Sequence, residues 1–181
     1  MLLNYIKRVF GLPIQDGIYP AKPVHFPFIV DEILKEAAKG NFNPDCVRSA
    51  EHRTSLKSQI KTSISKGHCR TVLGDATSRI AVIYKDNEVC GFSWSVAASA
   101  NSIELSMLSV RDENRGDGLG KKMLRESLSI YPKGYEVIVR IYKDEYKSDH
   151  NKYMQKMILN EGFREDSKQN KSTNQFVKLI T

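Results

Sequence analysis

Residues 108–124, LSVRDENRGDGLGKKML, are the stretch that decides how this chain is expected to fold. An apolar strand runs into a turn with glycines at 116, 118 and 120, and a helix with an apolar stripe follows. Glycine tolerates positive φ and lets a ligand approach the backbone closely. The first turn of a helix carries free amides and a positive dipole end, which suit a phosphate group. The stretch therefore predicts either an ordinary strand–turn–helix connection or a phosphate-binding loop, with Arg115, Lys121 and Lys122 adding positive charge.

The composition is that of a globular protein. Of 181 residues, 40% are hydrophobic and 27% are charged, which is ordinary for one domain with a sizeable core. No apolar run approaches the ~20 residues of a membrane-spanning helix. The N-terminal MLLNYIKRVFGLP has too short an apolar core for a secretory signal. We therefore expect a cytoplasmic protein without a membrane partner, in which residues 1–16 are an appendage and residues 17–181 form the domain.

The net charge of +7 favours anionic partners in general. Arg53, Lys57 and Lys61 recur at four-residue spacing, which predicts either a solvated helix face or contact with an acidic acceptor or RNA. No mixture of aromatic and basic residues accompanies them, so we do not expect nucleic acid to be a partner. The three cysteines and four histidines lack metal-ligand spacing, so we expect reduced thiols and no metal.

Hydrophobic periodicity predicts alternating helices and strands. Helices are expected at residues 28–39, 48–66, 118–130 and about 148–160. Strands are expected at residues 17–22, 79–85, 88–97, 103–110, 135–142 and 175–180, with Asp86-Asn87 as a two-residue hairpin turn.

The period of two within the strands predicts which side chains share a face. One face is expected to be core, with Phe92, Trp94, Val96, Ile103, Leu105 and Met107. The other face is expected to be small and polar and to carry a single carboxylate, with Ser93, Ser95, Glu104 and Ser106.

Two motifs in the chain resemble the GNAT superfamily of N-acetyltransferases. RGDGLG at 115–120 fits that family's R/Q-x-x-G-x-G/A signature, and NKYMQKMILNEGF at 151–163 is similar to its N-x-x-A-x-x-x-Y-x-x-x-G-F helix. YPAKPVHFPFI at 19–29 also resembles the family's first strand and the entry into its first helix. The resemblance covers residues 17–181. It implies a mixed α/β (α+β) single domain, with a mostly antiparallel seven-strand sheet splayed between strands 4 and 5 and flanked by about four helices.

The resemblance also implies that acetyl-CoA binds in the splayed cleft as a cosubstrate. Its pantetheine would pair with backbone groups of Leu108, Ser109 and Val110, and Asn151 would reach the pantetheine arm. The pyrophosphate would lie on the amides of Arg115, Gly116, Asp117, Gly118, Leu119, Gly120 and Lys121.

Aminolysis of a thioester requires a neutral amine, whereas an alkylammonium ion has a pKa of about 10. Glu104 is the expected base, directly or through a water molecule, because it lies on the polar face of a strand leading into the cleft. The alternative is that Glu104 only pairs with a cation. The family's helix often carries a tyrosine seven residues after the asparagine, where it protonates the leaving thiolate, but that position here is Ile158. Either Tyr142 substitutes for it or the thiolate leaves without a protein acid.

The sequence thus predicts an acetyl-CoA-dependent N-acetyltransferase acting on a primary amine by direct attack on the thioester, as a monomer or homodimer. Two alternatives stay open. One is a non-catalytic acetyl-CoA sensor or scaffold, and the other is transfer to an RNA-linked acceptor such as aminoacyl-tRNA. The acceptor itself cannot be read from the sequence, although Arg140 in its pocket would favour one carrying a carboxylate or phosphate.

Overall fold

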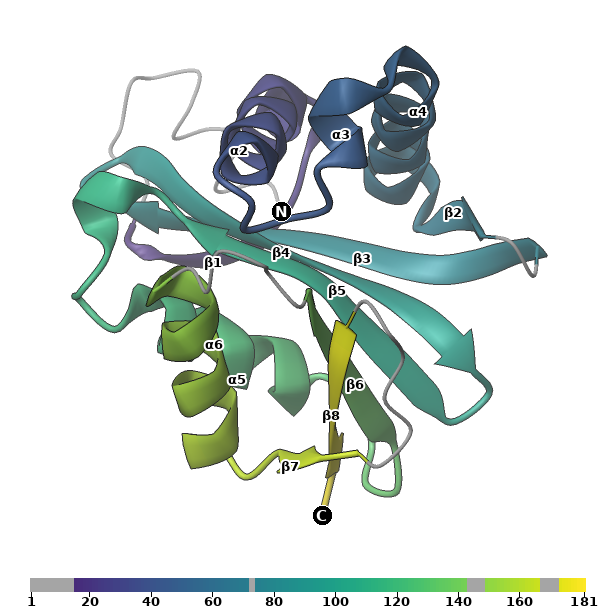
Figure 1. Ribbon diagram of the computed structural model, residues 1–181, viewed down its shortest axis with the longest axis vertical. Coiled ribbons are helices and arrows are strands. Elements are labelled where there is room, and N and C mark those ends of the chain that lie inside the picture. Colours follow the sequence, from purple (N-terminus) through teal and green to yellow (C-terminus); the bar gives the residue numbers. More distant parts are fainter. Residues whose placement is uncertain (1–14, 72–73, 143–148, 167–172) are drawn as a thin grey trace.

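The computed structural model describes residues 15–71, 74–142, 149–166 and 173–181 (Figure 1). The predicted appendage therefore falls almost entirely outside the described residues. The described strands are β1 (Gly17–Pro20), β2 (His68–Thr71), β3 (Gly74–Lys85), β4 (Glu88–Ser99), β5 (Ser102–Val110), β6 (Glu136–Tyr142), β7 (Arg164–Glu165) and β8 (Thr173–Leu179). The described α-helices are α2 (Phe26–Ala38), α3 (Asp45–Arg48), α4 (Ala50–Lys66), α5 (Leu119–Ser129) and α6 (Asp149–Asn160).

The strands form one sheet in the order β1-β3-β4-β5-β6-β8-β7, with β2 paired to β3. Every pairing is antiparallel except that of β5 with β6, as expected for a mixed, mostly antiparallel sheet. The described sheet has eight strands rather than the predicted seven. The expected helices and strands are all present with shifted ends, and β2, β7 and α3 are additions that the periodicity did not predict.

Local chemistry explains where several elements begin and end. Asp86 and Asn87 take φ of 51° and 67°, the left-handed values of a tight hairpin turn, which confirms the predicted connection between β3 and β4. Ser49 caps α4 by accepting a hydrogen bond from the His52 amide, and Gly67 ends the helix at φ 70°. None of the described helices has the length and apolar character that crossing a lipid bilayer would require.

The sheet separates two hydrophobic clusters (Figure 1). Helices α2, α3 and α4 cover one face, where Ile33 and Ile60 pack on Val82, Phe92 and other strand residues. Helices α5 and α6 cover the other face. Burial of both faces makes this a three-layer α/β/α domain.

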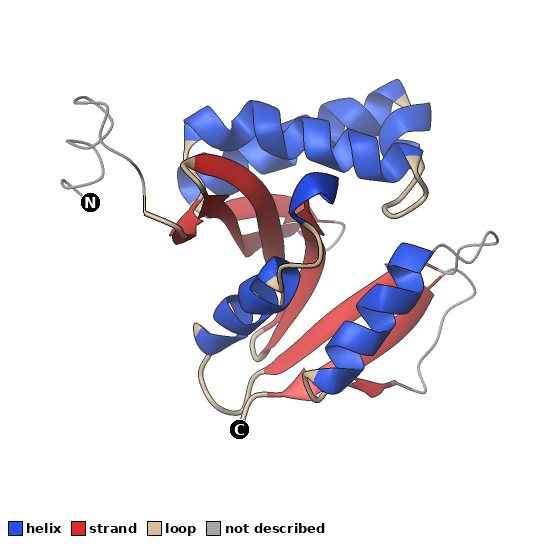
Figure 2. Cartoon of the chain, turned by 90° about the vertical axis from the view of Figure 1, so that its left-hand side faces the viewer, coloured by secondary structure: helices blue, strands red, loops and turns tan. Residues whose placement is uncertain are grey.

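Strands β5 and β6 part soon after they meet. Their parallel pairing covers only Ser102↔Glu136, Ile103↔Val137 and Glu104↔Ile138. Beyond Glu104 the two strands diverge, and Figure 2 shows β6 and β8 turned away from the first half of the sheet. This divergence is the predicted splay between the fourth and fifth strands, which are β5 and β6 here.

A β-bulge in β5 changes which residues share a face. Trp94 pairs with Met107 but Ser95 pairs with Leu105, so Ser106 is left outside the ladder. Leu105 consequently belongs to the α5–α6 cluster, whereas Met107 packs against the α2–α4 cluster. The prediction that these two side chains share a face is therefore wrong, because one extra residue reverses the alternation.

Candidate active site

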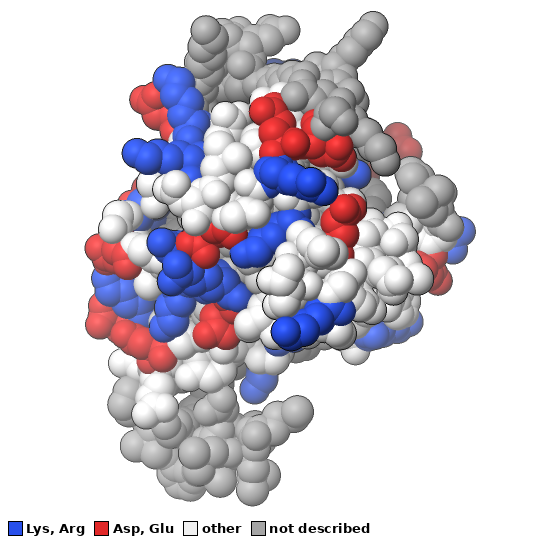
Figure 3. Space-filling view, turned by 90° about the horizontal axis from the view of Figure 1, so that it is seen from below, with Lys and Arg blue, Asp and Glu red and all other residues white. Residues whose placement is uncertain are grey.

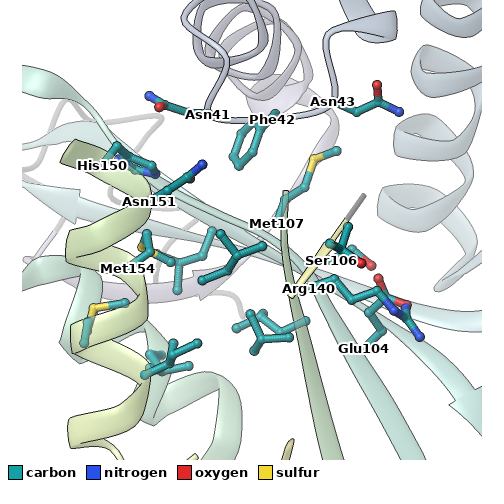
Figure 4. A pocket seen from close by; sticks show the side chains of 18 of the residues that line it. Asn41, Phe42, Asn43, Glu104, Ser106, Met107, Arg140, His150, Asn151 and Met154 are labelled. Carbon is teal, nitrogen blue, oxygen red and sulfur yellow. The ribbon is translucent and has the colours of Figure 1, made fainter. Parts of the chain in front are cut away.

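The divergence of β5 and β6 opens a cavity of about 260 Å³. Figure 4 shows its labelled lining, with His150 and Asn151 of α6 on one side and Glu104 and Arg140 on the other. Phe42, from the connection between α2 and α3, lies over the opening. We call this space the central cavity.

A second cavity, of about 430 Å³, lies at the glycine-rich turn. Its lining combines the end of β5, residues 114–116 and 118–120, and the first turns of α6. It shares Leu108, His150, Met154 and Met157 with the central cavity, so the two spaces adjoin. We call it the loop cavity.

The backbone of the turn has the features of an anion site. Gly116 and Gly118 take φ of 97° and 74°, and α5 begins immediately after Gly118. None of the amides from Gly116 to Lys121 donates to a backbone carbonyl within the described residues. The converging free amides and the positive end of the α5 dipole favour a phosphate at this point.

Arg115 is engaged inside the protein. Its Nη2 lies 2.8 Å from Oε2 of Glu36, its Nη1 lies 2.8 Å from Oδ1 of Asp112, and its Nε donates to the Val110 carbonyl at 2.8 Å. Its amide donates to the Asp112 carbonyl. The Arg115 amide therefore already has a partner, which leaves the amides of residues 116–121 for an anion, and we call these amides the amide cradle. The Arg115 side chain clamps the turn rather than presenting a free cation.

Glu36 is the buried centre of this clamp, with a fully buried side chain. Burial alone would raise its pKa, but hydrogen bonds from Lys39, Asn41 and Arg115 outweigh burial and lower the pKa below the ordinary 4.5. Hydrogen bonds from Lys39 and Lys35 likewise lower the pKa of Asp112 to about 2. The cluster ties α2 to the glycine turn.

The other basic side chains near the turn are also partly paired. Lys121 lies 3.2 Å from Glu161, which Arg125 also binds, and Lys85 pairs with Asp117. Figure 3, which views the molecule from below relative to Figure 1, shows Lys and Arg side chains lying among Asp and Glu side chains. The net positive charge therefore does not gather into one continuous basic surface on the face shown.

Glu104 lies on the face of the sheet that α2 and α4 cover. It pairs across the sheet with Val96, which packs against the α2–α4 cluster. Its carboxylate accepts a hydrogen bond from Nη1 of Arg140 on β6. Arg140 also donates to Gln175 at 3.1 Å, so the guanidinium is held from two sides.

The predicted polar face is divided by the Ser106 bulge. Ser93 and Ser95 face α5, where their hydroxyls bond Ser127 at 3.0 Å and Tyr131 at 2.6 Å. The expectation that they share a face with Glu104 is wrong, because the extra residue turns Glu104 to the opposite side. Ser106 and Arg140 do line the central cavity.

A wide groove of about 1070 Å³ opens on the same face as Glu104. It shares Glu104, Ser106, Met107 and Arg140 with the central cavity. The central cavity therefore adjoins both the loop cavity, which lies at the glycine turn, and the groove on the α2–α4 face. Glu104 stands where the groove meets the central cavity.

The remaining predicted residues take varied positions. Leu108, Ser109 and Val110 end β5 beside the loop cavity, and the Ser109 hydroxyl donates to the buried Glu32 at 2.9 Å. Asn151 is buried in the first turn of α6 and lines the central cavity. Ile158 is fully buried there. Tyr142 ends β6 opposite Thr173, and its side chain lies outside the described residues.

Sequence reasoning missed His150, which lines both cavities. Burial lowers the pKa of its imidazole, and the nearby Arg115 acts in the same direction. The signal available in the sequence was its position directly before Asn151, at the start of the second motif. No group of three or more His, Cys, Asp or Glu side chains among the described residues could hold a metal ion.

No family model and no curated protein matches this sequence. Solved structures do resemble it. The paia N-acetyltransferase from Thermoplasma acidophilum, solved in complex with coenzyme A, is 16% identical, with a TM-score of 0.67 over 92% of this chain and 100% of that chain. The Salmonella typhimurium protein yncA, solved with its cofactor acetyl-CoA, is 13% identical, with a TM-score of 0.63 over 93% and 95% of the chains.

A GNAT-family acetyltransferase from Bacillus cereus is 17% identical, with a TM-score of 0.57 over 93% of this chain and 99% of that chain. These likenesses cover nearly the whole chain in each case. They show that the chain has the fold of the GNAT acetyltransferases, as the resemblance of the two motifs predicted.

Proposed function

We propose that the protein transfers the acetyl group of acetyl-CoA to a primary amine. The observation that carries the proposal is that the central cavity, between the splayed strands, adjoins the loop cavity at the glycine turn and the groove on the α2–α4 face. Such an arrangement lets two substrates reach one point from different sides. Solved structures of this fold hold coenzyme A or acetyl-CoA, which supports the choice of acyl donor.

We assign binding groups to two parts of the donor, the pyrophosphate and the pantetheine arm. The amides from Gly116 to Lys121 would hold the pyrophosphate at the start of α5. The edge of β5 over Leu108, Ser109 and Val110 has no pairing with β6, so it is open to the amide groups of pantetheine. Asn151 would contact the pantetheine arm from α6.

Acetyl-CoA supplies an activated acyl group, and the protein supplies proton transfer and alignment. Glu104 would accept a proton from the incoming ammonium, directly or through water, which frees the nitrogen lone pair. The neutral nitrogen then bonds to the carbonyl carbon while the carbon–sulfur bond breaks and the electron pair leaves on sulfur. The nitrogen releases its second proton to solvent or to the departing thiolate, which gives the neutral amide. A backbone N–H near Leu108 or Ser109 would stabilise the charge that develops on the carbonyl oxygen.

The proton donor for the thiolate is a separate question. Ile158 has no proton to give, so we propose Tyr142 for this role. A thiol has an ordinary pKa of about 8.5, so its anion is also able to leave without a donor.

The test is release of the coenzyme A thiol in the presence of a panel of primary amines. We expect amine-dependent release by the wild-type protein, and we expect Gly118→Trp to lose acetyl-CoA binding because an indole would occupy the amide cradle. Unchanged acetyl-CoA affinity in Gly118→Trp would contradict the cradle.

A non-catalytic acetyl-CoA sensor is the second candidate, and Ile158 in place of the family's tyrosine is the observation that favours it. This candidate predicts saturable acetyl-CoA binding without acetylation of any amine in a cell extract. Mass spectrometry after incubation with isotopically labelled acetyl-CoA separates the two functions.

A further inference from the structure

The groove on the α2–α4 face points to a class of acceptor. We propose that it receives a polypeptide and that the acceptor amine is a lysine side chain of that polypeptide. This inference rests on the proposed acetyl transfer and narrows its second substrate. The groove volume of about 1070 Å³ lies just above the range of about 300–1,000 Å³ for small-ligand pockets.

The groove continues on both sides of Glu104. Its lining along β4 runs from Trp94 to Ser99, and Val96, the cross-strand partner of Glu104, lies between these two residues. Five residue steps of a strand span about 17 Å. A chain lying in the groove would therefore pass Glu104 rather than end there. A side-chain amine on a long stem, which is what lysine offers, reaches the central cavity from such a chain.

The charged side chains that line the groove cancel one another. Arg70 lies 3.6 Å from Asp75, and Arg140 is paired with Glu104. An acceptor with several positive charges, such as a polyamine or an aminoglycoside, calls for an excess of carboxylates. An acceptor that carries a carboxylate or phosphate would be bound by an unpaired cation, but Glu104 and Gln175 already engage Arg140. The lining therefore favours neither a cationic nor an anionic acceptor. Arg140 was expected to favour an acceptor with a carboxylate or phosphate, but its pairing removes that preference.

What the groove does offer is neutral hydrogen bonding. Ser55, Gln59, Ser99 and Ser106 contribute hydroxyl or amide groups to its lining. Trp94 also lines it and is only 3% exposed, and its indole N–H has no hydrogen-bond partner among the described residues. A buried donor without a partner is costly and is rare in folded proteins. A peptide backbone carries one neutral donor and one neutral acceptor per residue, which matches this lining.

The experiment measures acetylation of four acceptors by the full chain with labelled acetyl-CoA. They are a pentapeptide with blocked termini and a central lysine, the same peptide with a free N-terminus and arginine replacing lysine, free lysine, and spermidine. We expect kcat/KM to be at least tenfold higher for the blocked lysine peptide than for each of the others. A preference for any of the other three overturns the inference while leaving acetyl transfer standing. No transfer to any of the four, with acetyl-CoA bound, defeats the proposed function and the inference with it.

A matched pair of variants tests whether the lysine peptide binds in the groove. Ala98 lines the groove and is exposed, whereas Ala100 is exposed two residues later and does not line it. We expect Ala98→Trp to raise KM for the lysine peptide about tenfold or more by filling the groove. Its acetyl-CoA Kd should stay unchanged, and Ala100→Trp should change neither constant. An unchanged peptide KM in Ala98→Trp would overturn the assignment of the groove.

Discussion

Nη1 of Arg140 on β6 donates a hydrogen bond to Oε2 of Glu104 on β5, and Glu104 belongs to the last backbone pair between the two strands. The ion pair therefore bridges the strands at the point where they separate. It also fixes one carboxylate oxygen of the proposed base. In the proposed reaction this geometry makes Arg140 a positioning residue, which holds the Glu104 carboxylate.

Replacing Arg140 by methionine should release the Glu104 carboxylate from this position. We expect kcat to fall by roughly 10- to 100-fold, because a small misplacement of a catalytic group has effects of this size. Arg140→Lys should recover part of the loss, since lysine restores one donor and the charge. Steady-state kinetics and acetyl-CoA titration check this, and a changed acetyl-CoA Kd would argue against a role confined to Glu104.

Replacing Glu104 by glutamine removes the proposed base but keeps the shape of the side chain. General base catalysis typically contributes about 10²- to 10⁴-fold, so kcat/KM at neutral pH should fall by that range. The difference in kcat/KM between the two proteins should shrink as the pH approaches about 10, because the amine in solution is then neutral without a catalytic base. A pH profile of both proteins is the measurement. Equal rates at every pH would remove Glu104 from the mechanism.

Gly118 and Gly134 provide a matched test of the amide cradle. Both take left-handed φ values, 74° and 88°, and a Cβ added at either would meet no atom within 4 Å. Alanine at each should therefore lower the unfolding free energy by a similar amount, about 1 kcal/mol. Only Gly118→Ala should also weaken acetyl-CoA binding, because Gly118 lines the loop cavity whereas Gly134 lines neither cavity nor the groove. Equal acetyl-CoA affinities in the two variants would contradict the cradle.

Glu36→Gln should destabilise the fold and weaken acetyl-CoA binding together. The substitution leaves Arg115 and Lys39 without their buried carboxylate, and loss of one partner of a buried pair costs about 3 kcal/mol. The turn that Arg115 clamps would loosen as a result. Denaturant unfolding and acetyl-CoA titration measure the two effects. Lost stability with unchanged affinity would show that the clamp does not support the turn.

The lowered pKa of Glu36 predicts that the stability of the fold depends on pH. Its folded-state pKa lies below the ordinary 4.5, so its contribution is complete above pH 4.5 and is lost as the pH falls through the folded-state value. Asp112, with a pKa of about 2, contributes with the same sign. The difference in unfolding free energy between wild type and Glu36→Gln should therefore narrow below pH 4.5. A difference that stays constant from pH 7 to pH 3 would contradict this account.

Features with a local cause were predictable from the sequence. Asp86-Asn87 specifies its own turn, and the glycines at 116 and 118 specify the conformation that precedes α5. The splay of the sheet was predicted only from the resemblance of the two motifs to the GNAT superfamily, because no local sequence pattern indicates it. The four-residue strand β2 was missed because HCRT has neither clear alternation nor a strong strand propensity.

Features that depend on distant partners were not predictable. Glu36 sits in a stretch that looks like an ordinary amphipathic helix, and its pairing with Arg115 joins residues 79 positions apart. The bulge at Ser106 is invisible because Ile103, Leu105 and Met107 keep a perfect period of two in the sequence. Only the pairing with β4 shows that the faces exchange between Leu105 and Met107.

Because Ser106 lies outside the ladder, the alternation of side chains along β5 is reversed at this residue, and the parts before and after it are out of phase. The part before Ser106 carries Glu104, the proposed base, and the part after it lines the loop cavity, where we propose that acetyl-CoA binds. Deleting Ser106 would restore the alternation and turn the Glu104 carboxylate toward the apolar cluster beneath α5, so the proposed acetyl transfer should be lost although neither motif changes.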